Sequence, residues 1–202
     1  MTTPRDASAA IRAQQGNIRS ALPFSDTRDF DDANRGLVVP IEEPVLAEDG
    51  SVLWDNSTYD FLEGDPPDTV NPSLWRQSQL AAIDGLFEVV EGIYQVRGMD
   101  LSNTSIVEGD EGIIVFDTLL SVETGAAALA LYRKHRGDRP VKAVVITHSH
   151  ADHFGGIRGF VSVTPATVVG HNSAMGRVWV VGSLNVDRPW RVERHPAVGE
   201  TV

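Results

Sequence analysis

The sequence predicts an α/β fold preceded by an extended N-terminal arm. Residues 113–147 read as an apolar strand, an Ala-rich helix and a second apolar strand, which is the pattern of a parallel βαβ unit. Four short apolar runs between residues 86 and 116 predict a strand meander before it. The first 70 residues are acidic and rich in turn-forming residues. We therefore divide the chain into an arm (1–70), an α/β region (71–162) and a tail of different character (163–202).

The composition excludes several classes of protein. Of the 202 residues, 42% are hydrophobic and 22% are charged, which suits a folded domain with one core. The chain has no cysteine, so disulfides, thiolate metal sites and thiol nucleophiles are excluded. A net charge of -11 opposes binding to nucleic acid or to anionic membranes, and suits a metal cation better as a partner.

The sequence shows neither a secretion signal nor a membrane span. The first 20 residues contain three arginines but no apolar stretch of signal-peptide length. No stretch approaches the roughly 20 apolar residues that a membrane helix needs. We expect a cytoplasmic protein, although the lack of cysteine is equally compatible with the periplasm.

The arm carries much of the negative charge. Residues 1–75 hold 14 Asp and Glu against 5 Arg. Apolar islands at residues 37–39 and 52–54 interrupt this acidic stretch and need a place to be buried. We expect the arm to wrap around the core, the alternative being a solvated acidic tail.

The following elements have clear boundary signals. Asn71 is a good N-cap and Pro72 a good first helical residue, so a short helix is predicted from Pro72 to about residue 83. Two β-prone runs separated by Glu91-Gly92 predict a hairpin, and two further strands follow. The four predicted strands are residues 86–90, 93–96, 104–107 and 112–116.

The βαβ unit is the most readable part of the chain. Its first strand, residues 113–116, is continuously apolar, which is typical of a strand covered on both faces. A helix is predicted over residues 122–136, with Ser121 as its N-cap, and a second strand over residues 141–147. Residues 166–170 are a candidate for the next strand. Ligands of parallel sheets bind at the carboxyl ends of strands, so functional side chains are expected just after Thr147.

Three histidines and an aspartate follow Thr147 within six positions. In an extended chain His148 and His150 point to the same side, so both can bind one metal ion. As the chain turns, Asp152 and His153 can reach a neighbouring ion, and paired metals lie about 3.5–4 Å apart. Imidazole and carboxylate groups are ligands that zinc accepts.

Other interpretations of this motif are weaker. The motif could be a polar loop whose histidines bond to the nearby backbone, but that is a better account of a lone histidine than of such a cluster. A helix running through the motif is disfavoured by the β-branched residues before it and by Gly155 and Gly156 after it. These two glycines indicate instead a sharp turn or a close approach of the backbone.

The pattern His-x-His-x-Asp-His after a strand resembles the metal motif of the metallo-β-lactamase superfamily. Flanking segments are similar to the alkyl sulfatase branch of that superfamily, over roughly residues 17–162. The resemblance implies an αββα sandwich, of which this chain holds only the first half, in residues 71–162. The similar segments are residues 71–77, 85–98, 100–103 and 147–156, with residues 22–24 and 29–33 in the arm.

The resemblance also implies a zinc-dependent hydrolase. His148 and His150 would hold one zinc ion, and Asp152, which we also expect to be catalytic, would hold a second ion with His153. A water molecule bridging the ions would be the nucleophile or the base as an alkyl sulfate ester is cleaved into alcohol and sulfate. Asp117 resembles an acid that supports the metal loop, although an aspartate at a strand end is as often a turn residue. Relatives of full length are expected to be homodimers.

The resemblance ends before the metal site is complete. Catalytic zinc takes three protein ligands, and the alkyl sulfatases draw the missing ones from far downstream. From residue 163 the sequence departs from the branch, so we expect a truncated chain, a frame change or a fragment gene, and the chain can be inactive. His171 is the best local candidate for a further ligand, ahead of Glu193, His195 and Glu200, and His135 is expected to be structural.

Two other functions stay open at this point. The motif alone fits other hydrolases of the superfamily, which act on thioesters, lactones or phosphodiesters. A chain with an unfinished sheet could also be a non-catalytic fragment that serves as a binding module.

Overall fold

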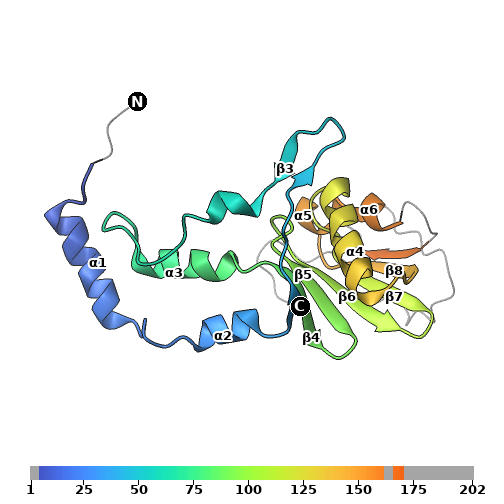
Figure 1. Ribbon diagram of the computed structural model, residues 1–202, viewed down its shortest axis with the longest axis horizontal. Coiled ribbons are helices and arrows are strands. Elements are labelled where there is room, and N and C mark those ends of the chain that lie inside the picture. Colours follow the sequence, from blue (N-terminus) through green and yellow to red (C-terminus); the bar gives the residue numbers. More distant parts are fainter. Residues whose placement is uncertain (1–4, 162–165, 171–202) are drawn as a thin grey trace, which may run out of the picture.

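The computed structural model describes residues 5–161 and 166–170, and its centre is a seven-stranded mixed sheet (Figure 1). The spatial order is β1-β4-β5-β6-β7-β8-β9. The pairs from β1 to β7 are antiparallel, whereas β7, β8 and β9 are parallel. The predicted meander followed by a parallel unit is therefore confirmed. The strands are β1 (Leu37–Val39), β4 (Gly85–Val90), β5 (Ile93–Arg97), β6 (Thr104–Gly109), β7 (Gly112–Phe116), β8 (Val141–Ile146) and β9 (Thr167–Gly170).

Helix α4 (Val122–Arg136) makes the crossover between β7 and β8, with the predicted bounds. The Ser121 hydroxyl accepts a hydrogen bond from the Thr124 N–H at 3.1 Å, and the Thr124 hydroxyl accepts one from the Ser121 N–H at 3.1 Å. This capping box satisfies donors that the first turn would leave unpaired. Gly137 ends the helix at a φ of 94°, a conformation that favours glycine.

Two short helices follow β8 and pack beside α4. They are α5 (Ala151–Phe154) and α6 (Ile157–Val161). A methyl group on Gly159 would lie 2.4 Å from the Val122 carbonyl oxygen, so only glycine lets α6 approach α4 this closely. Together with α4, these helices cover one face of the sheet.

The other face of the sheet is partly open, which corrects the expectation that β7 is covered on both faces. Ile113 and Val115 are fully buried, but Ile114 and Phe116 are 38% and 37% exposed. Successive side chains of a strand point to opposite faces, so Ile113 and Val115 lie on one face of the sheet and Ile114 and Phe116 on the other. Within the described residues, no second sheet packs against Ile114 and Phe116, so only one half of the expected sandwich is seen.

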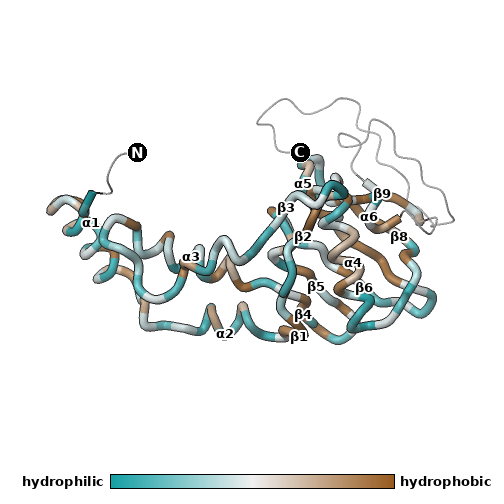
Figure 2. The backbone as a smooth tube through the Cα atoms, turned by 45° about the horizontal axis from the view of Figure 1, so that its top comes forward, coloured by the Kyte–Doolittle hydropathy of each residue, from teal (hydrophilic) through white to brown (hydrophobic). Residues whose placement is uncertain are grey.

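The arm is not simply extended. Helices α1 (Ala9–Ala21) and α2 (Arg28–Asn34) lie beside α3 (Pro72–Ala81), and the three project away from the sheet (Figures 1 and 2). Asn71 caps α3 as predicted, by accepting the Ser73 N–H at 2.9 Å. None of the described helices is long and apolar enough to cross a bilayer.

The apolar islands of the arm do reach the domain, although only part of them is buried. The first island is β1, which pairs with β4 at the edge of the sheet. The second is β3 (Val52–Trp54), which forms a two-stranded ribbon with β2 (Val45–Leu46) and leads into a 3-10 helix, η1 (Asn56–Tyr59). Val45 and Trp54 pack on the core, whereas Leu37 and Val52 are 41% and 59% exposed.

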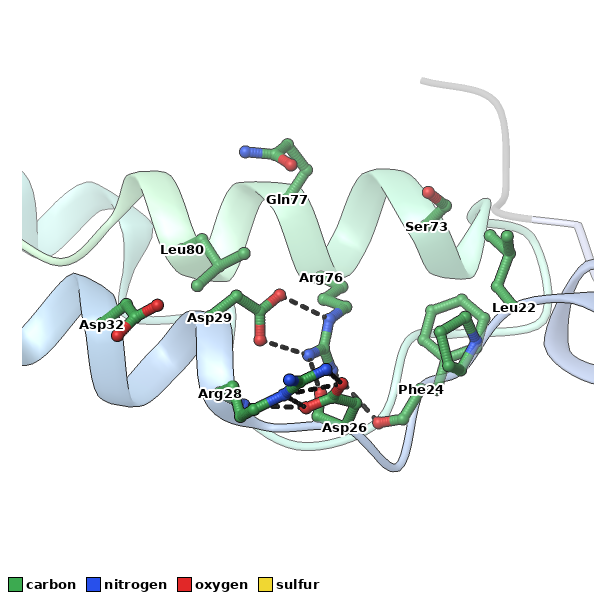
Figure 3. A pocket seen from close by; sticks show the side chains of 11 residues that line it. Leu22, Phe24, Asp26, Arg28, Asp29, Asp32, Ser73, Arg76, Gln77 and Leu80 are labelled. Carbon is green, nitrogen blue, oxygen red and sulfur yellow. Dashed lines mark hydrogen bonds and ion pairs between the residues drawn. The ribbon is translucent and has the colours of Figure 1, made fainter.

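One arginine holds α2 and the segment before it against α3. Arg76 of α3 donates to the Asp29 carboxylate of α2 at 3.1 Å and to the Phe24 carbonyl oxygen at 3.1 Å (Figure 3). Its guanidinium also lies 4.8 Å from the centre of the Phe30 ring, within cation–π range. Arg76 and Asp29 thus pair across α3 and α2, whereas Arg28 pairs with Asp26 just before its own helix.

A second charged group stabilises the end of the sheet where β7 begins. The buried Tyr132 hydroxyl donates to Glu108 Oε1 at 2.8 Å, and Arg136 Nε donates to the same oxygen at 3.0 Å. The hydrogen bond from Arg136 holds the pKa of Glu108 below its usual value. Burial, followed by the hydrogen bond to Glu108, raises the pKa of Tyr132.

We expect Glu108→Gln to lower the free energy of unfolding at pH 7 by about 1.5–3 kcal/mol, the range for a hydrogen bond to a charged group. The folded pKa of Glu108 is lowered, so its ionised form stabilises the fold above the unfolded pKa of about 4.3. That contribution is lost as the pH falls through the folded pKa. Urea unfolding of both proteins at pH 7 and pH 3 should show a gap that shrinks in acid. A gap that widens in acid would contradict this account.

Candidate metal site

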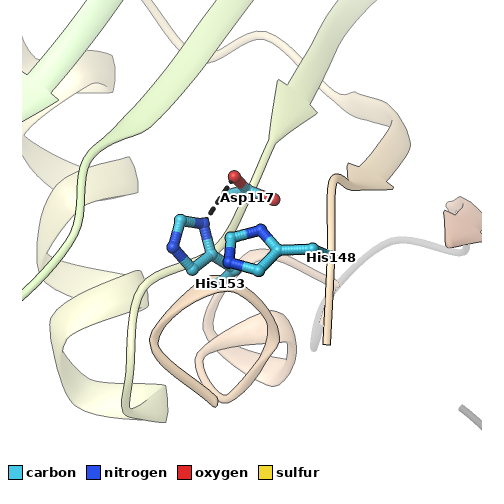
Figure 4. A group of neighbouring side chains, drawn as sticks. All are labelled: Asp117, His148 and His153. Atoms are coloured by element: carbon cyan, nitrogen blue, oxygen red, sulfur yellow. Dashed lines mark hydrogen bonds and ion pairs between the residues drawn. The ribbon is translucent and has the colours of Figure 1, made fainter. Parts of the chain in front are cut away.

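The four residues of the predicted motif and Asp117 meet at one edge of the sheet. Asp117 follows β7, and the motif follows β8, the parallel neighbour of β7. His148 and His150 lie in the segment between β8 and α5, whereas Asp152 and His153 lie on α5 (Figure 4 shows Asp117, His148 and His153). This is the carboxyl end of the parallel strands, where we expected functional side chains.

A short helix inside the motif corrects our sequence interpretation. We expected no helix there, but α5 begins at Ala151, directly after His150, whose backbone is extended at φ -75° and ψ 140°. The β-branched residues end at Thr147 and the glycines begin at Gly155, so neither lies within the helical turn. The helix turns Asp152 and His153 back toward the preceding histidines.

The side chains form two pairs, each with the spacing of ligands on one ion. His148 Nε2 lies 3.1 Å from His150 Nδ1, and His153 Nε2 lies 3.4 Å from Asp152 Oδ2. Two ligands on a tetrahedral zinc ion, at bond lengths of about 2.0–2.1 Å, are about 3.3 Å apart. The His148 and His153 rings are 3.9 Å apart between centroids, so the two pairs are adjacent. The donor atoms and spacings therefore fit a pair of zinc ions.

Asp117 orients one of these candidate ligands. Its carboxylate is buried and lies 2.7 Å, through Oδ2, from His153 Nδ1. It also accepts the Thr147 N–H at 2.8 Å through Oδ1. A carboxylate at Nδ1 favours the tautomer with a proton there, which leaves the lone pair on Nε2, the atom beside Asp152.

Asp117 could also be counted as a ligand, because its carboxylate and the rings of His148 and His153 bring donor atoms within 4.8 Å of one another. We assign it the orienting role, because both of its oxygens are already engaged. Oδ1 accepts the Thr147 N–H, and Oδ2 accepts the Thr147 hydroxyl and lies against His153 Nδ1. Among the described residues, no other group of three such side chains occurs. A third protein ligand for each pair is therefore not found in this part of the chain.

The loop after Asp117 presses against α5. Asp117 and Leu119 have φ angles of 58° and 68°, which are uncommon for residues other than glycine. The Thr118 N–H donates to the His153 carbonyl oxygen at 2.8 Å. A methyl group on Gly155 or Gly156 would lie 2.0 Å from a carbonyl oxygen of this loop. The expectation that these glycines permit a close backbone approach is confirmed.

None of the remaining candidate ligands is placed at the site by the described part of the chain. His171, Glu193, His195 and Glu200 lie outside the described residues. His135 is exposed in the last turn of α4, where a cation suits the helix dipole, and it belongs to no described ligand group.

Sequence reasoning missed three residues that support the site. Thr147 donates to Asp117 through both its backbone N–H and its hydroxyl. The Ser102 hydroxyl donates to the Asp152 carbonyl oxygen, and Asp100 holds the Ser102 N–H at 3.1 Å. Thr147 could have been found from the sequence, because its hydroxyl group stands directly before the first histidine of the motif. Asp100 and Ser102 were noticed only within a segment similar to the alkyl sulfatases.

Comparison with known proteins places the chain in a family. The sequence profile of the metallo-β-lactamase superfamily matches residues 97–180. The chain is 54% identical over 162 residues to a linear primary-alkylsulfatase from Pseudomonas, covering 79% of this chain and 24% of that protein. It is 49% identical over 146 residues to an alkyl/aryl-sulfatase of Saccharomyces cerevisiae, covering 71% of this chain and 23% of that protein.

A solved structure agrees with the sequence comparisons. The fold matches that of the stereoselective inverting sec-alkylsulfatase Pisa1 from Pseudomonas with a TM-score of 0.75 and 49% identity, over 79% of this chain and 25% of that one. The chain thus spans about a quarter of the length of these relatives. Over that part, the chain belongs to the alkyl sulfatase branch of the metallo-β-lactamase superfamily.

Proposed function

We propose that this chain binds two zinc ions and takes part in the hydrolysis of alkyl sulfate esters to alcohol and sulfate. The observation that carries the proposal is the pair of ligand spacings, 3.1 Å for His148 and His150 and 3.4 Å for Asp152 and His153. The choice of alkyl sulfates as substrates rests on the similarity to alkylsulfatases.

Each residue has a distinct task in this proposal. His148 and His150 hold one zinc ion, and Asp152 and His153 hold the other. Bound zinc supplies a Lewis acid for the sulfate group and lowers the pKa of water. Asp117 keeps the proton on His153 Nδ1, so that Nε2 stays available as a ligand. Asp152 Oδ1 makes no hydrogen bond to the described residues, so it can accept a proton from an attacking water.

Removal of the first ligand pair tests the metal site. We expect the unaltered chain to retain zinc after dialysis, and His148→Ala combined with His150→Ala to lose most of it, because two imidazole ligands are missing. Zinc is measured by elemental analysis against protein concentration. His135→Ala is the matched control, since it removes an exposed histidine outside the motif, and it should retain zinc like the unaltered chain. Equal zinc content in all three proteins would reject the site.

A sulfate-release assay tests the proposed reaction. With zinc supplied, we expect the chain to release sulfate from dodecyl sulfate, measured by ion chromatography. Release should stop in the double histidine variant and continue in His135→Ala. A chain that binds zinc but releases no sulfate would contradict the proposed hydrolysis and leave the metal site intact.

Replacement of Asp117 by Asn tests its orienting role. Asn tolerates the left-handed backbone at this position but cannot hold the proton on His153 Nδ1 as a carboxylate does. We expect zinc affinity, measured by competition with a chelator, to fall about 10- to 100-fold. Asp138→Asn is the control, because Asp138 forms only an exposed ion pair with Arg133. Unchanged affinity in Asp117→Asn would show that Asp117 has no such role.

A further inference from the structure

A buried aspartate outside the metal motif joins three segments around it. Asp100 is 6% exposed, and its Oδ1 accepts the Ser102 N–H at 3.1 Å. Its Oδ2 accepts the Leu120 N–H at 2.7 Å and the Thr124 hydroxyl at 2.6 Å. Asp100 therefore connects its own loop, the loop after β7 and the first turn of α4.

Two of these segments hold the backbone of the residues that we assign to the second zinc ion. The Ser102 hydroxyl donates to the Asp152 carbonyl oxygen. From the other side, the Thr118 N–H donates to the His153 carbonyl oxygen at 2.8 Å. The first turn of α5 is thus held between the loop of Ser102 and the loop of Thr118, and Asp100 bonds to both loops.

The loop after β7 needs such support. Leu119 has a φ of 68° and is fully buried, and a residue other than glycine is strained when it is held in this conformation. The hydrogen bond from the next residue, Leu120, to Asp100 fixes the loop in this shape. The Gly156 N–H then donates to the Leu119 carbonyl oxygen at 2.9 Å, which fixes the end of α5 against it.

We propose that Asp100 is a positioning residue for the metal site. It acts through Ser102 and Leu120 to set the place of Asp152 and His153 relative to the first ligand pair. Asp100 touches neither ligand side chain, so its effect passes through the backbone. The assignment of Asp152 and His153 as ligands rests on the proposed function, whereas their placement by Asp100 does not.

Two variants test this proposal at different strengths. Asp100→Asn keeps the shape of the side chain but replaces one acceptor oxygen by a donor group, so it cannot accept all three hydrogen bonds. Ser102→Ala removes only the hydroxyl bond to Asp152 and leaves the backbone bond to Asp100 possible. This milder variant keeps the test decisive if Asp100→Asn does not fold.

The first measurement needs no metal. In the metal-free chain, the proton on His153 Nδ1 is hydrogen-bonded to Asp117 and protected from exchange with water, so it should give a downfield ring resonance in nitrogen-edited NMR. His153→Gln, which removes the ring, assigns the signal. We expect the signal to broaden or vanish in Asp100→Asn and in Ser102→Ala. An unchanged signal in both variants would overturn the proposal.

The second measurement is cobalt binding, followed by titration of the visible absorption bands. We expect both variants to bind Co²⁺ about 10- to 100-fold more weakly than the unaltered chain, as for residues that orient ligands. Glu108→Gln is the matched control, because it weakens the fold at the opposite end of β7, where Glu108 pairs with Ile113. Its cobalt affinity and its His153 signal should stay unchanged. If Glu108→Gln lost as much cobalt affinity as Asp100→Asn, Asp100 would contribute only to the stability of the fold. That result would overturn the proposal.

The two measurements separate failure of this proposal from failure of the proposed function. If the unaltered chain binds no cobalt, the proposed zinc site is wrong, and the NMR comparison still decides whether Asp100 places His153. If the unaltered chain binds cobalt and the variants bind it equally well, Asp100 is not a positioning residue and the zinc site stands.

Discussion

The site depends on one buried carboxylate at the ends of two parallel strands. Asp117 ends β7 and fixes the end of β8 through the Thr147 N–H. The same carboxylate reaches His153 on the helix that follows. A buried carboxylate is costly unless it is hydrogen-bonded, and these contacts satisfy both oxygens of Asp117. The sheet edge, the metal motif and α5 are therefore one structural unit.

The βαβ unit could be predicted because its signals are local. The alternation of apolar runs, the Ser121 cap and Gly137 all lie within or beside the elements that they define. The open face of β7 could not be predicted in this way. A continuous apolar run shows that a strand is suited to burial on both faces, but what covers Ile114 and Phe116 depends on other parts of a sandwich. The arm helices were missed because acidic, turn-forming residues outweighed the weak helical signal of α1 and α2.

The candidate metal motif could also be predicted because its signal is local: four candidate ligands fall within six positions. In the structure, His148 lies beside His150 and Asp152 lies beside His153. The support around the ligands is non-local and escaped the analysis. Ser102 lies 50 residues from Asp152 in sequence, and no spacing rule connects them. The short helix α5 could not be predicted either, because it depends on tertiary contacts: the loop after β7 packs directly against it.

The central claim is that two neighbouring pairs of side chains hold two zinc ions. X-ray absorption at the zinc edge, on protein loaded with two equivalents of zinc, tests this most directly. The account predicts imidazole nitrogen and carboxylate oxygen at about 2.0–2.2 Å, and a second zinc at about 3.5–4 Å. A spectrum that is explained by water oxygens alone, with neither imidazole nor a neighbouring metal, would contradict it.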